Sequence, residues 1–237
     1  MYICHSFNRK ETHTEAVIYY MENWGLSVPC NEDIYFLESD YAELQDILEG
    51  EGSVLIVLTQ YLGTDTEALV ELDIIRKLFI DGKVKVFTFC YDVDLEELPC
   101  RMEWLKKTEM LPIEGAVSLY QAICSIIDVH LDEDIKKTGS MGNCRKMADE
   151  LIRGDRYISE LLKEYEGLEK YATKTKIVVL YAIYRYISVT YTIKSENSFY
   201  ANCITHVFEE LDCQEQCRTL QLRIVERSLL LLILRNF

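Results

Sequence analysis

Two glutamates, Glu67 and Glu71, stand four residues apart in the stretch from residue 61 to residue 82. This spacing places both carboxylates on one face of a helix, one turn above the other. Residues 53–59, directly before that stretch, form a continuous apolar run that is typical of a strand buried on both sides. Open α/β sheets bind ligands just beyond the carboxyl ends of parallel strands. The sequence therefore predicts a carboxylate at the ligand-binding edge of a sheet.

Predicted strands and helices alternate from the N-terminus to about residue 135. The pattern predicts strands at residues 2–7, 26–30, 53–59, 83–91 and 110–113, and helices at residues 11–24, 41–48, 64–80 and 116–131. This alternation is the signature of βαβ units, which build a parallel sheet with helices on both faces.

The sequence changes character near residue 137. Residues 136–142 hold two glycines among polar residues and predict a linker. From residue 143 onward there are two glycines and no proline, and helices are expected at residues 143–166, 168–194, 197–211 and 213–236. Propensity alone would allow a strand within the second of these, but its length favours a buried helix. We expect an α/β domain over residues 1–137 and an all-α helical domain over residues 138–237.

The charge balance argues against nucleic acid and anionic membranes as partners. The chain carries 40 acidic and 25 basic residues, a formal net charge of −15, whereas nucleic-acid binding needs a basic footprint. The longest apolar runs, such as residues 229–234, are far shorter than the roughly 20 residues of a membrane span. The first residues show no secretory pattern, so the nine cysteines are expected to be reduced. These features predict a soluble, cytoplasmic protein.

Four short motifs follow one another in the order and spacing of a known family. Residues 3–6 (ICHS) fall at a strand end, residues 24–28 (WGLSV) lead into the second strand, residues 53–59 (SVLIVLT) precede a tyrosine, and residues 70–72 (VEL) lie on the next helix. Together they resemble the TIR domain, the Toll/interleukin-1 receptor module, in a bacterial-type protein with a C-terminal helical domain. The resemblance covers about residues 1–135 and implies a flavodoxin-like parallel sheet.

In catalytic TIR proteins the glutamate of the "EL" motif cleaves the nicotinamide–ribose bond of NAD, and here that residue is Glu71. Departure of nicotinamide leaves positive charge on the ribose, which a fixed carboxylate stabilises. The resemblance therefore implies an NAD nucleosidase, either a glycohydrolase or an ADP-ribose cyclase, in defence or immune-type signalling. NAD would be the substrate, and neither a cofactor nor a metal is expected.

The resemblance also implies a set of substrate-binding residues. Arg9 would pair with the pyrophosphate, and Phe7 would contact a ring. The acidic loop at residues 31–36 corresponds to the family's BB loop, which partly covers the site and mediates self-association. A homo-oligomer through the TIR-like domain, the helical domain or both is therefore expected. The expected substrate-binding residues are Ser6, Phe7, Asn8, Arg9, Tyr35 and Phe36.

A non-catalytic interpretation stands beside this one. Glu67 occupies a position near which the family has a tryptophan or cysteine, and the acidic loop lacks the family's usual glycine. The alternative is a TIR interaction module that acts as a scaffold by homotypic assembly, with Glu71 as a solvated helix residue.

A separate group of possible metal ligands lies near the C-terminus. Cys203 and His206, followed by Cys213 and Cys217, supply four side chains of the types that bind zinc. Their spacing is not that of a common zinc ribbon, and cysteine is often a core residue. We therefore expect no metal there. The sequence also lacks the glycine motifs of Rossmann and P-loop sites.

Overall fold

The protein is described by a computed structural model that covers residues 1–7, 12–30, 41–138, 146, 150, 154–213 and 215–236. The chain divides into two compact units. The α/β unit comprises Met1–Glu22 and Leu26–Ala122, and the helical unit comprises Asn23–Gly25 and Ile123–Phe237. Four of the expected site residues lie outside the described residues: Asn8, Arg9, Tyr35 and Phe36.

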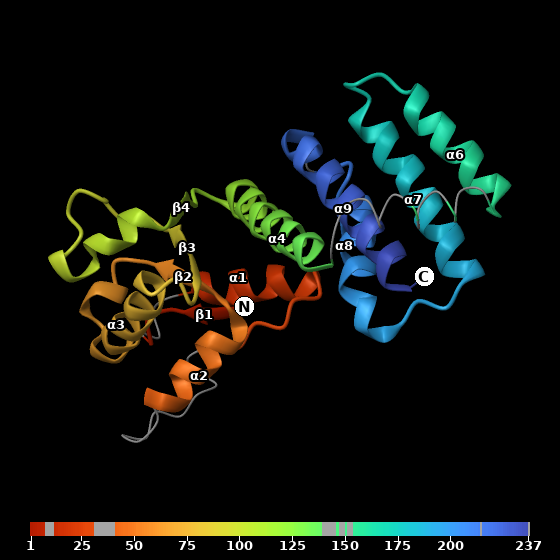
Figure 1. The fold of residues 1–237 in the computed structure, drawn as a ribbon. Helices are drawn as coiled ribbons and strands as arrows, with labels where there is room; N and C mark the ends of the chain where they lie inside the picture. Colours follow the sequence, from red (N-terminus) through yellow and green to blue (C-terminus); the bar gives the residue numbers. More distant parts are fainter. Residues whose placement is uncertain are drawn as a thin grey trace. The chain divides into compact units, whose positions relative to one another are not determined.

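Four parallel strands form the sheet of the α/β unit, in the order β1 (Tyr2–Cys4), β2 (Ser53–Leu58), β3 (Lys85–Cys90) and β4 (Glu109–Pro112) (Figure 1). Ile3 pairs with Leu55, Leu55 with Phe87, and Phe87 with Glu109. In β2 and in β3 every residue except the first is buried, as expected for central strands of a parallel sheet. The predicted α/β class with a parallel sheet is confirmed.

Two predictions at the N-terminal edge of this sheet are wrong in extent. Residues 26–30 form only an isolated parallel bridge, between Cys30 and Ile3, beside a hydrogen bond from Ile3 N to Pro29 O of 2.9 Å. Pro29 has no backbone N–H, so it cannot donate to a regular ladder. β1 ends at Cys4 and not at Phe7, because the Phe7 N–H is bonded to a side chain, that of Asp65, rather than to a neighbouring strand.

Helices and 3₁₀ turns alternate with the strands along the chain, and the last of these helices, α4, continues into the helical unit. The helices are α1 (His13–Asn23), α2 (Tyr41–Glu51), α3 (Thr66–Ile80) and α4 (Ala116–Thr138), and the 3₁₀ turns are η2 (Leu62–Thr64) and η3 (Cys100–Lys107). Residues of α2, α3 and η3 share one buried cluster with one face of the strands; its members include Leu44, Ile56, Leu72, Ile75 and Leu105. Alternate strand residues on the opposite face, such as Ile3, Leu55 and Phe87, are also buried. Both faces of the sheet are therefore covered.

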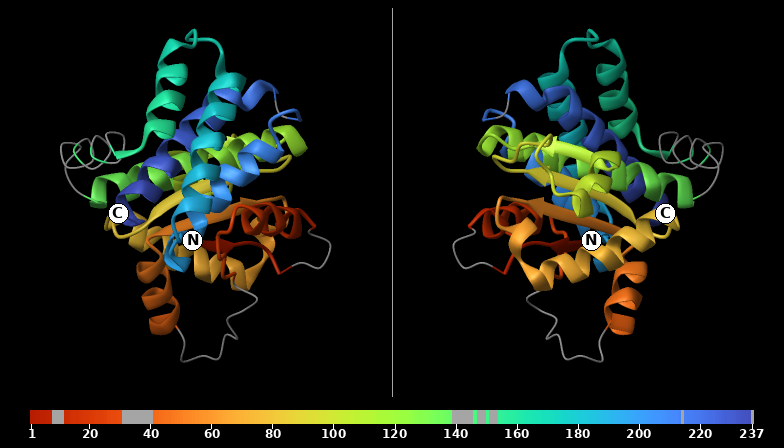
Figure 2. Two further views of the ribbon diagram at one scale, coloured as in Figure 1. Left: turned by 90° about the vertical axis from the view of Figure 1, so that its right-hand side faces the viewer. Right: turned by 90° about the vertical axis from the view of Figure 1, so that its left-hand side faces the viewer.

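The helical unit contains α6 (Arg156–Gly167), α7 (Thr173–Thr190), α8 (Ser198–Glu209) and α9 (Arg218–Asn236), with short 3₁₀ turns η4 (Ser195–Asn197) and η5 (Glu215–Cys217). α7 is helical throughout, which confirms the preference for helix over strand. α6 and α7 run side by side (Figure 2). α6 begins after Asp155, whose carboxylate caps it by accepting from the N–H groups of Tyr157 and Ile158.

The predicted linker at residues 136–142 is partly wrong, because α4 continues to Thr138. Lys136 pairs with Asp132 one turn earlier at 2.6 Å, which supports the last turns of the helix. The remaining residues of that linker lie outside the described residues.

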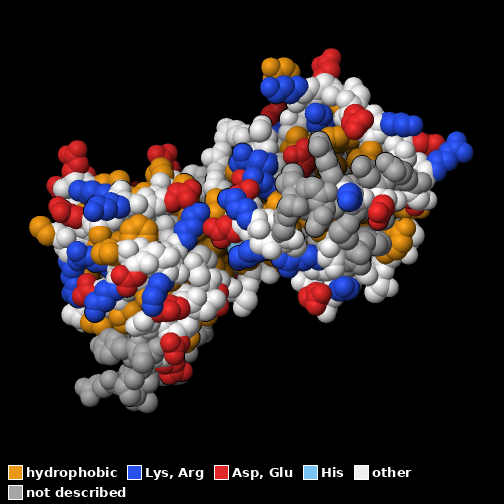
Figure 3. Space-filling view, in the orientation of Figure 1, with side chains coloured by type: hydrophobic (Ala, Val, Ile, Leu, Met, Phe, Trp, Pro, Cys, Tyr) orange, Lys and Arg blue, Asp and Glu red, His pale blue; other side chains and the backbone are white. Residues whose placement is uncertain are grey.

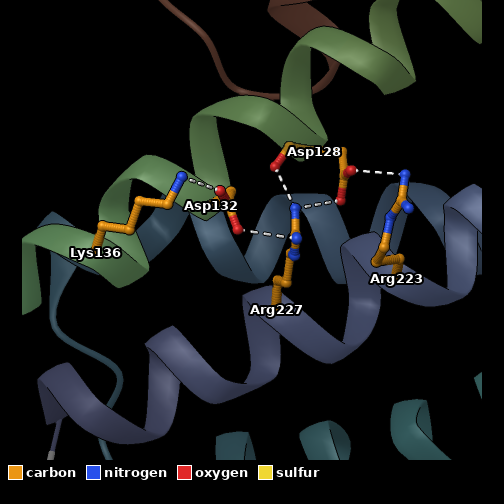
Figure 4. A network of polar contacts seen from close by, with 5 residues as sticks. All are labelled: Asp128, Asp132, Lys136, Arg223 and Arg227. Atoms are coloured by element: carbon orange, nitrogen blue, oxygen red, sulfur yellow. Dashed lines mark hydrogen bonds and ion pairs between the residues drawn. The ribbon is translucent and has the colours of Figure 1, made fainter. Parts of the chain in front are cut away.

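An ion-pair network binds α4 to α9 within the helical unit (Figure 4). Asp128, whose side chain is 9% exposed, pairs with Arg223 and Arg227 at 2.8 Å each, and Arg227 also contacts Asp132 at 2.9 Å. Arg227 donates a further hydrogen bond to the backbone oxygen of Asp128. Asp128 is nearly buried although its arginine partners are partly exposed, so removing an arginine would leave its charge less compensated, and the network favours this packing of the two helices.

The surface carries charges of both signs. On the face that Figure 3 shows, lysine and arginine side chains are interspersed with aspartate and glutamate side chains. Within the described part of the chain, no helix combines the length and the apolar character needed to cross a bilayer.

Substitution of two glycines, one at positive φ and one at negative φ, tests the backbone conformations at the ends of α2 and α3. Gly82 ends α3 with φ +68°, where a side chain is disfavoured, so Gly82→Ala should lower the free energy of unfolding by about 1–2 kcal/mol. Gly50 lies within α2 at negative φ, and a Cβ there meets no atom within 4 Å, so Gly50→Ala should raise stability by about 0.5 kcal/mol. Urea denaturation followed by circular dichroism measures both. Changes of the same sign in the two variants would contradict the assigned backbone conformations.

Candidate functional site

The carboxylate of Asp65 joins the end of β1 to the start of α3. Its Oδ1 accepts hydrogen bonds from the backbone N–H groups of Glu67 and Ala68, both at 3.2 Å. Its Oδ2 accepts from Ser6 Oγ at 2.9 Å and from the Phe7 N–H at 2.7 Å. An aspartate in this position satisfies free N–H groups of the first helical turn and interacts favourably with the helix dipole. One side chain thus fixes two segments that are far apart in sequence.

A pocket of about 350 Å³ opens at this junction, beyond the carboxyl ends of β1 and β2. We call it the β1–α3 pocket. Its lining residues are Ser6, Phe7, Tyr61, Thr64, Asp65, Thr66 and Glu67. Ser6 and Phe7, two of the expected substrate-binding residues, are therefore brought to one pocket. In parallel α/β sheets this edge is where ligands bind.

The two glutamates of α3 occupy different environments. Glu67 is exposed and lines the β1–α3 pocket, whereas Glu71 is 0% exposed and is not among the lining residues. On the face that they share, Glu67 lies at the rim of the pocket in the first turn of α3, and Glu71 lies in the core one turn later. The alternative interpretation of Glu71 as a solvated helix residue is therefore wrong.

Glu71 faces two side chains of β1. Tyr2 and Cys4 project from the same face of that strand, and both are fully buried. Burial, followed by the charge of Glu71 and hydrogen bonding with it, raises the pKa of the Tyr2 phenol and the pKa of the Cys4 thiol well above their usual values. Both groups therefore stay protonated at neutral pH and present hydrogens toward the carboxylate. An ionised carboxylate without such partners would be costly to bury.

The β1–α3 pocket is rich in hydrogen-bond acceptors. Asp65 and Glu67 contribute carboxylates, and the residues that line it in the described part of the chain include no lysine or arginine. Such a wall suits the hydroxyl groups of a sugar or a positively charged group. A diphosphate would need a cation, for which the sequence offers Arg9 in the undescribed segment after Phe7.

The possible zinc ligands near the C-terminus are not gathered into a site. Cys203 and Cys217 are buried, Cys213 is exposed, and the His206 ring packs against Trp24 with ring centroids 4.5 Å apart. Within the ranges that the structure describes, no group of three or more histidine, cysteine, aspartate or glutamate side chains is arranged to hold a metal ion.

Sequence reasoning missed Asp65 as the residue that organises this site. A signal for half of its role was present, because an aspartate directly before a helical run is a typical N-cap. The other half, the bonds to Ser6 and Phe7, depends on tertiary structure and has no local sequence pattern.

Comparison of the chain with models of protein families, with curated proteins and with solved structures gives no significant match. The TIR resemblance of residues 1–135 stays a prediction from their motifs.

Substitutions of Asp65 test its joining role. Asp65→Ala should lower the free energy of unfolding of the α/β unit by about 2–4 kcal/mol, because four donors lose their acceptor. A double-mutant cycle with Ser6→Ala, measured by urea denaturation, should give a coupling energy of about 1 kcal/mol. Asp46→Ala, at an exposed position of α2, is the control and should change stability by under about 0.5 kcal/mol. Strictly additive effects of Asp65→Ala and Ser6→Ala would contradict the contact.

Proposed function

We propose that the β1–α3 pocket binds NAD and that the protein cleaves the nicotinamide–ribose bond, as a TIR-type NAD nucleosidase. The observation that carries the proposal is the meeting of two elements at one pocket: the end of β1, with Ser6 and Phe7, and the start of α3, with Glu67. Glu71, the residue that the TIR motif assigns to catalysis, lies one turn further along the same face of α3.

The strand arrangement supports this choice of pocket. Cys30 bridges to Ile3 on one side of β1, and β2 pairs with β1 on the other side. This favours a flavodoxin-like order, in which residues 26–30 lie next to β1 at the edge of the sheet. In that order, successive strands are added on one side of β1 and then on the other. Ligands bind at such a switch point. The β1–α3 pocket lies at this point, because its walls come from the end of β1 and from the segment that follows β2.

The chemistry needs a carboxylate near the ribose. As nicotinamide leaves, positive charge develops on the sugar, and a fixed carboxylate stabilises that charge most strongly where water is excluded. Glu71 in the described conformation faces Tyr2 and Cys4, so catalysis requires its side chain to turn toward the pocket. We propose that homotypic assembly drives this rearrangement. Attack by water would make the protein a glycohydrolase, and attack by the adenine of the same molecule would make it a cyclase, in either case for defence signalling.

One observation favours a second candidate function. The complete burial of Glu71 against Tyr2 and Cys4 is also what a structural carboxylate would show, with the hydrogen bonds serving only the fold. The α/β unit would then be a non-catalytic TIR interaction module that acts through copies of itself.

Nicotinamide release separates the two candidates. Purified protein, from dilute to highly concentrated, is incubated with NAD, and nicotinamide is measured by chromatography. Glu71→Gln, which keeps the side-chain volume, should lower the rate at least about 100-fold because it removes the charge that stabilises the transition state. Glu67→Gln, on the same helix face at the pocket wall, is the matched variant and should lower the rate by about tenfold or less.

Circular dichroism melts of both variants show whether the fold is retained. An unchanged rate in folded Glu71→Gln would refute its catalytic role. Assembly of the unmodified protein with no nicotinamide release at any concentration would make the interaction module the better description.

A further inference from the structure

A second cavity, of about 290 Å³, opens beyond the carboxyl ends of β3 and β4, and all of its lining residues belong to the α/β unit. We call it the α1–α4 cavity, because two of its walls come from α1 and from the start of α4. From the sheet it is lined by Tyr91, directly after β3, and by Ile113, directly after β4. It has no described lining residue in common with the β1–α3 pocket.

The α1–α4 cavity and Glu71 lie on opposite faces of the sheet. Val86 and Cys90 of β3 belong to the buried cluster that α3 shares, whereas Phe89 and Tyr91 alternate with them and point to the other face. The His13 ring of α1 packs on Tyr91 and so covers that other face. A ligand in the α1–α4 cavity would therefore not occupy the place of NAD.

The wall of the α1–α4 cavity is mainly aromatic and aliphatic. The Tyr91 ring is stacked against the His13 ring, with centroids 4.2 Å apart and an interplanar angle of 17°. Tyr20 adds a second phenol ring from α1, and Ile113 and Leu119 add aliphatic surface. An open cavity with such walls keeps apolar surface in contact with water, and a ligand with an apolar body would remove that contact.

Two carboxylates give the same cavity a negative charge. Asp92 follows Tyr91 and Glu114 follows Ile113, and both line the cavity. Because β3 and β4 are paired and parallel, the two carboxylates approach from the same edge of the sheet. The lining residues in the described part of the chain include no lysine or arginine, so the wall itself does not compensate this charge.

The rings and the carboxylates together select a positively charged ligand that carries an aromatic ring. Aromatic rings prefer to pack on other rings, and carboxylates bind ammonium groups through charge-assisted hydrogen bonds. A small cation alone would leave Ile113 and Leu119 in contact with water. Within the described ranges no group of three histidine, cysteine, aspartate or glutamate side chains is arranged to hold a metal ion. An organic cation with a ring therefore fits this wall better than a metal ion.

We propose that the α1–α4 cavity binds an arylalkylamine, a flat aromatic ring joined to an ammonium group by a short chain. The ring would lie against Tyr20 and Leu119, and the ammonium group would donate hydrogen bonds to Asp92 and Glu114. This binding is independent of the proposed cleavage of NAD, because it uses other residues on the other face of the sheet.

Calorimetric titration of the full chain with tyramine at low ionic strength tests the proposal. One saturable site is expected, and raising the salt from about 20 mM to about 200 mM should weaken binding about threefold or more, because exposed charges are screened. 4-Ethylphenol, which lacks the ammonium group, and butylammonium, which lacks the ring, should each bind at least about tenfold more weakly. The absence of saturable tyramine binding would overturn the proposal, as would equal binding of either control compound.

Two matched pairs of variants locate the site. Tyr20→Leu, which removes a ring from the wall, should weaken tyramine binding by about fivefold, whereas Tyr19→Leu, at the exposed neighbouring position outside the wall, should change it by less than about twofold. Glu114→Gln should weaken binding by about fivefold, whereas Glu109→Gln, exposed at the start of β4, should change it by less than about twofold. Circular dichroism melts show whether each variant keeps its fold. Equal effects within either pair of folded variants would overturn the proposed site.

Discussion

The carboxylate of Asp65 is the contact on which the geometry of the candidate site depends. It caps α3 through Glu67 and Ala68 and at the same time holds Ser6 and Phe7 at the end of β1. One side chain thus satisfies donors from both walls of the β1–α3 pocket, and the same bonds orient the first turn of α3, which carries Glu67.

Burial separates the chemistry of the two glutamates. Glu67 meets solvent at the rim, whereas Glu71 lies in the core with protonated Tyr2 and Cys4 before it. A carboxylate in that position is already largely desolvated, which strengthens its interaction with any positive charge that reaches it. The same burial restricts access, so activity would depend on a conformational step. The need for a conformational step links the proposed catalysis to assembly. The same burial is also consistent with the alternative, a non-catalytic scaffold function.

The sequence predicted the parts of the fold that local patterns determine. The apolar runs of β2 and β3 and the helical period of α3 were sufficient, and length alone decided correctly that α7 is a helix. Residues 26–30 failed as a strand because Pro29 interrupts the ladder. Helical spacing placed Glu67 and Glu71 on one face of α3. It does not tell how far each side chain is buried in the protein, so the burial of Glu71 could not be foreseen. Arg9 and Tyr35 remain predictions, since they lie outside the described residues.

Binding of NAD at the end of β1 is the central claim, and amide chemical shifts test it most directly. In ¹⁵N-labelled Glu71→Gln protein, which should bind NAD without cleaving it, titration with NAD should shift the amide signals of Ser6, Phe7 and Glu67 along saturable curves. The Gly82 amide, at the opposite end of α3, should stay in place. Unchanged signals for Ser6, Phe7 and Glu67 at saturating NAD would contradict the account.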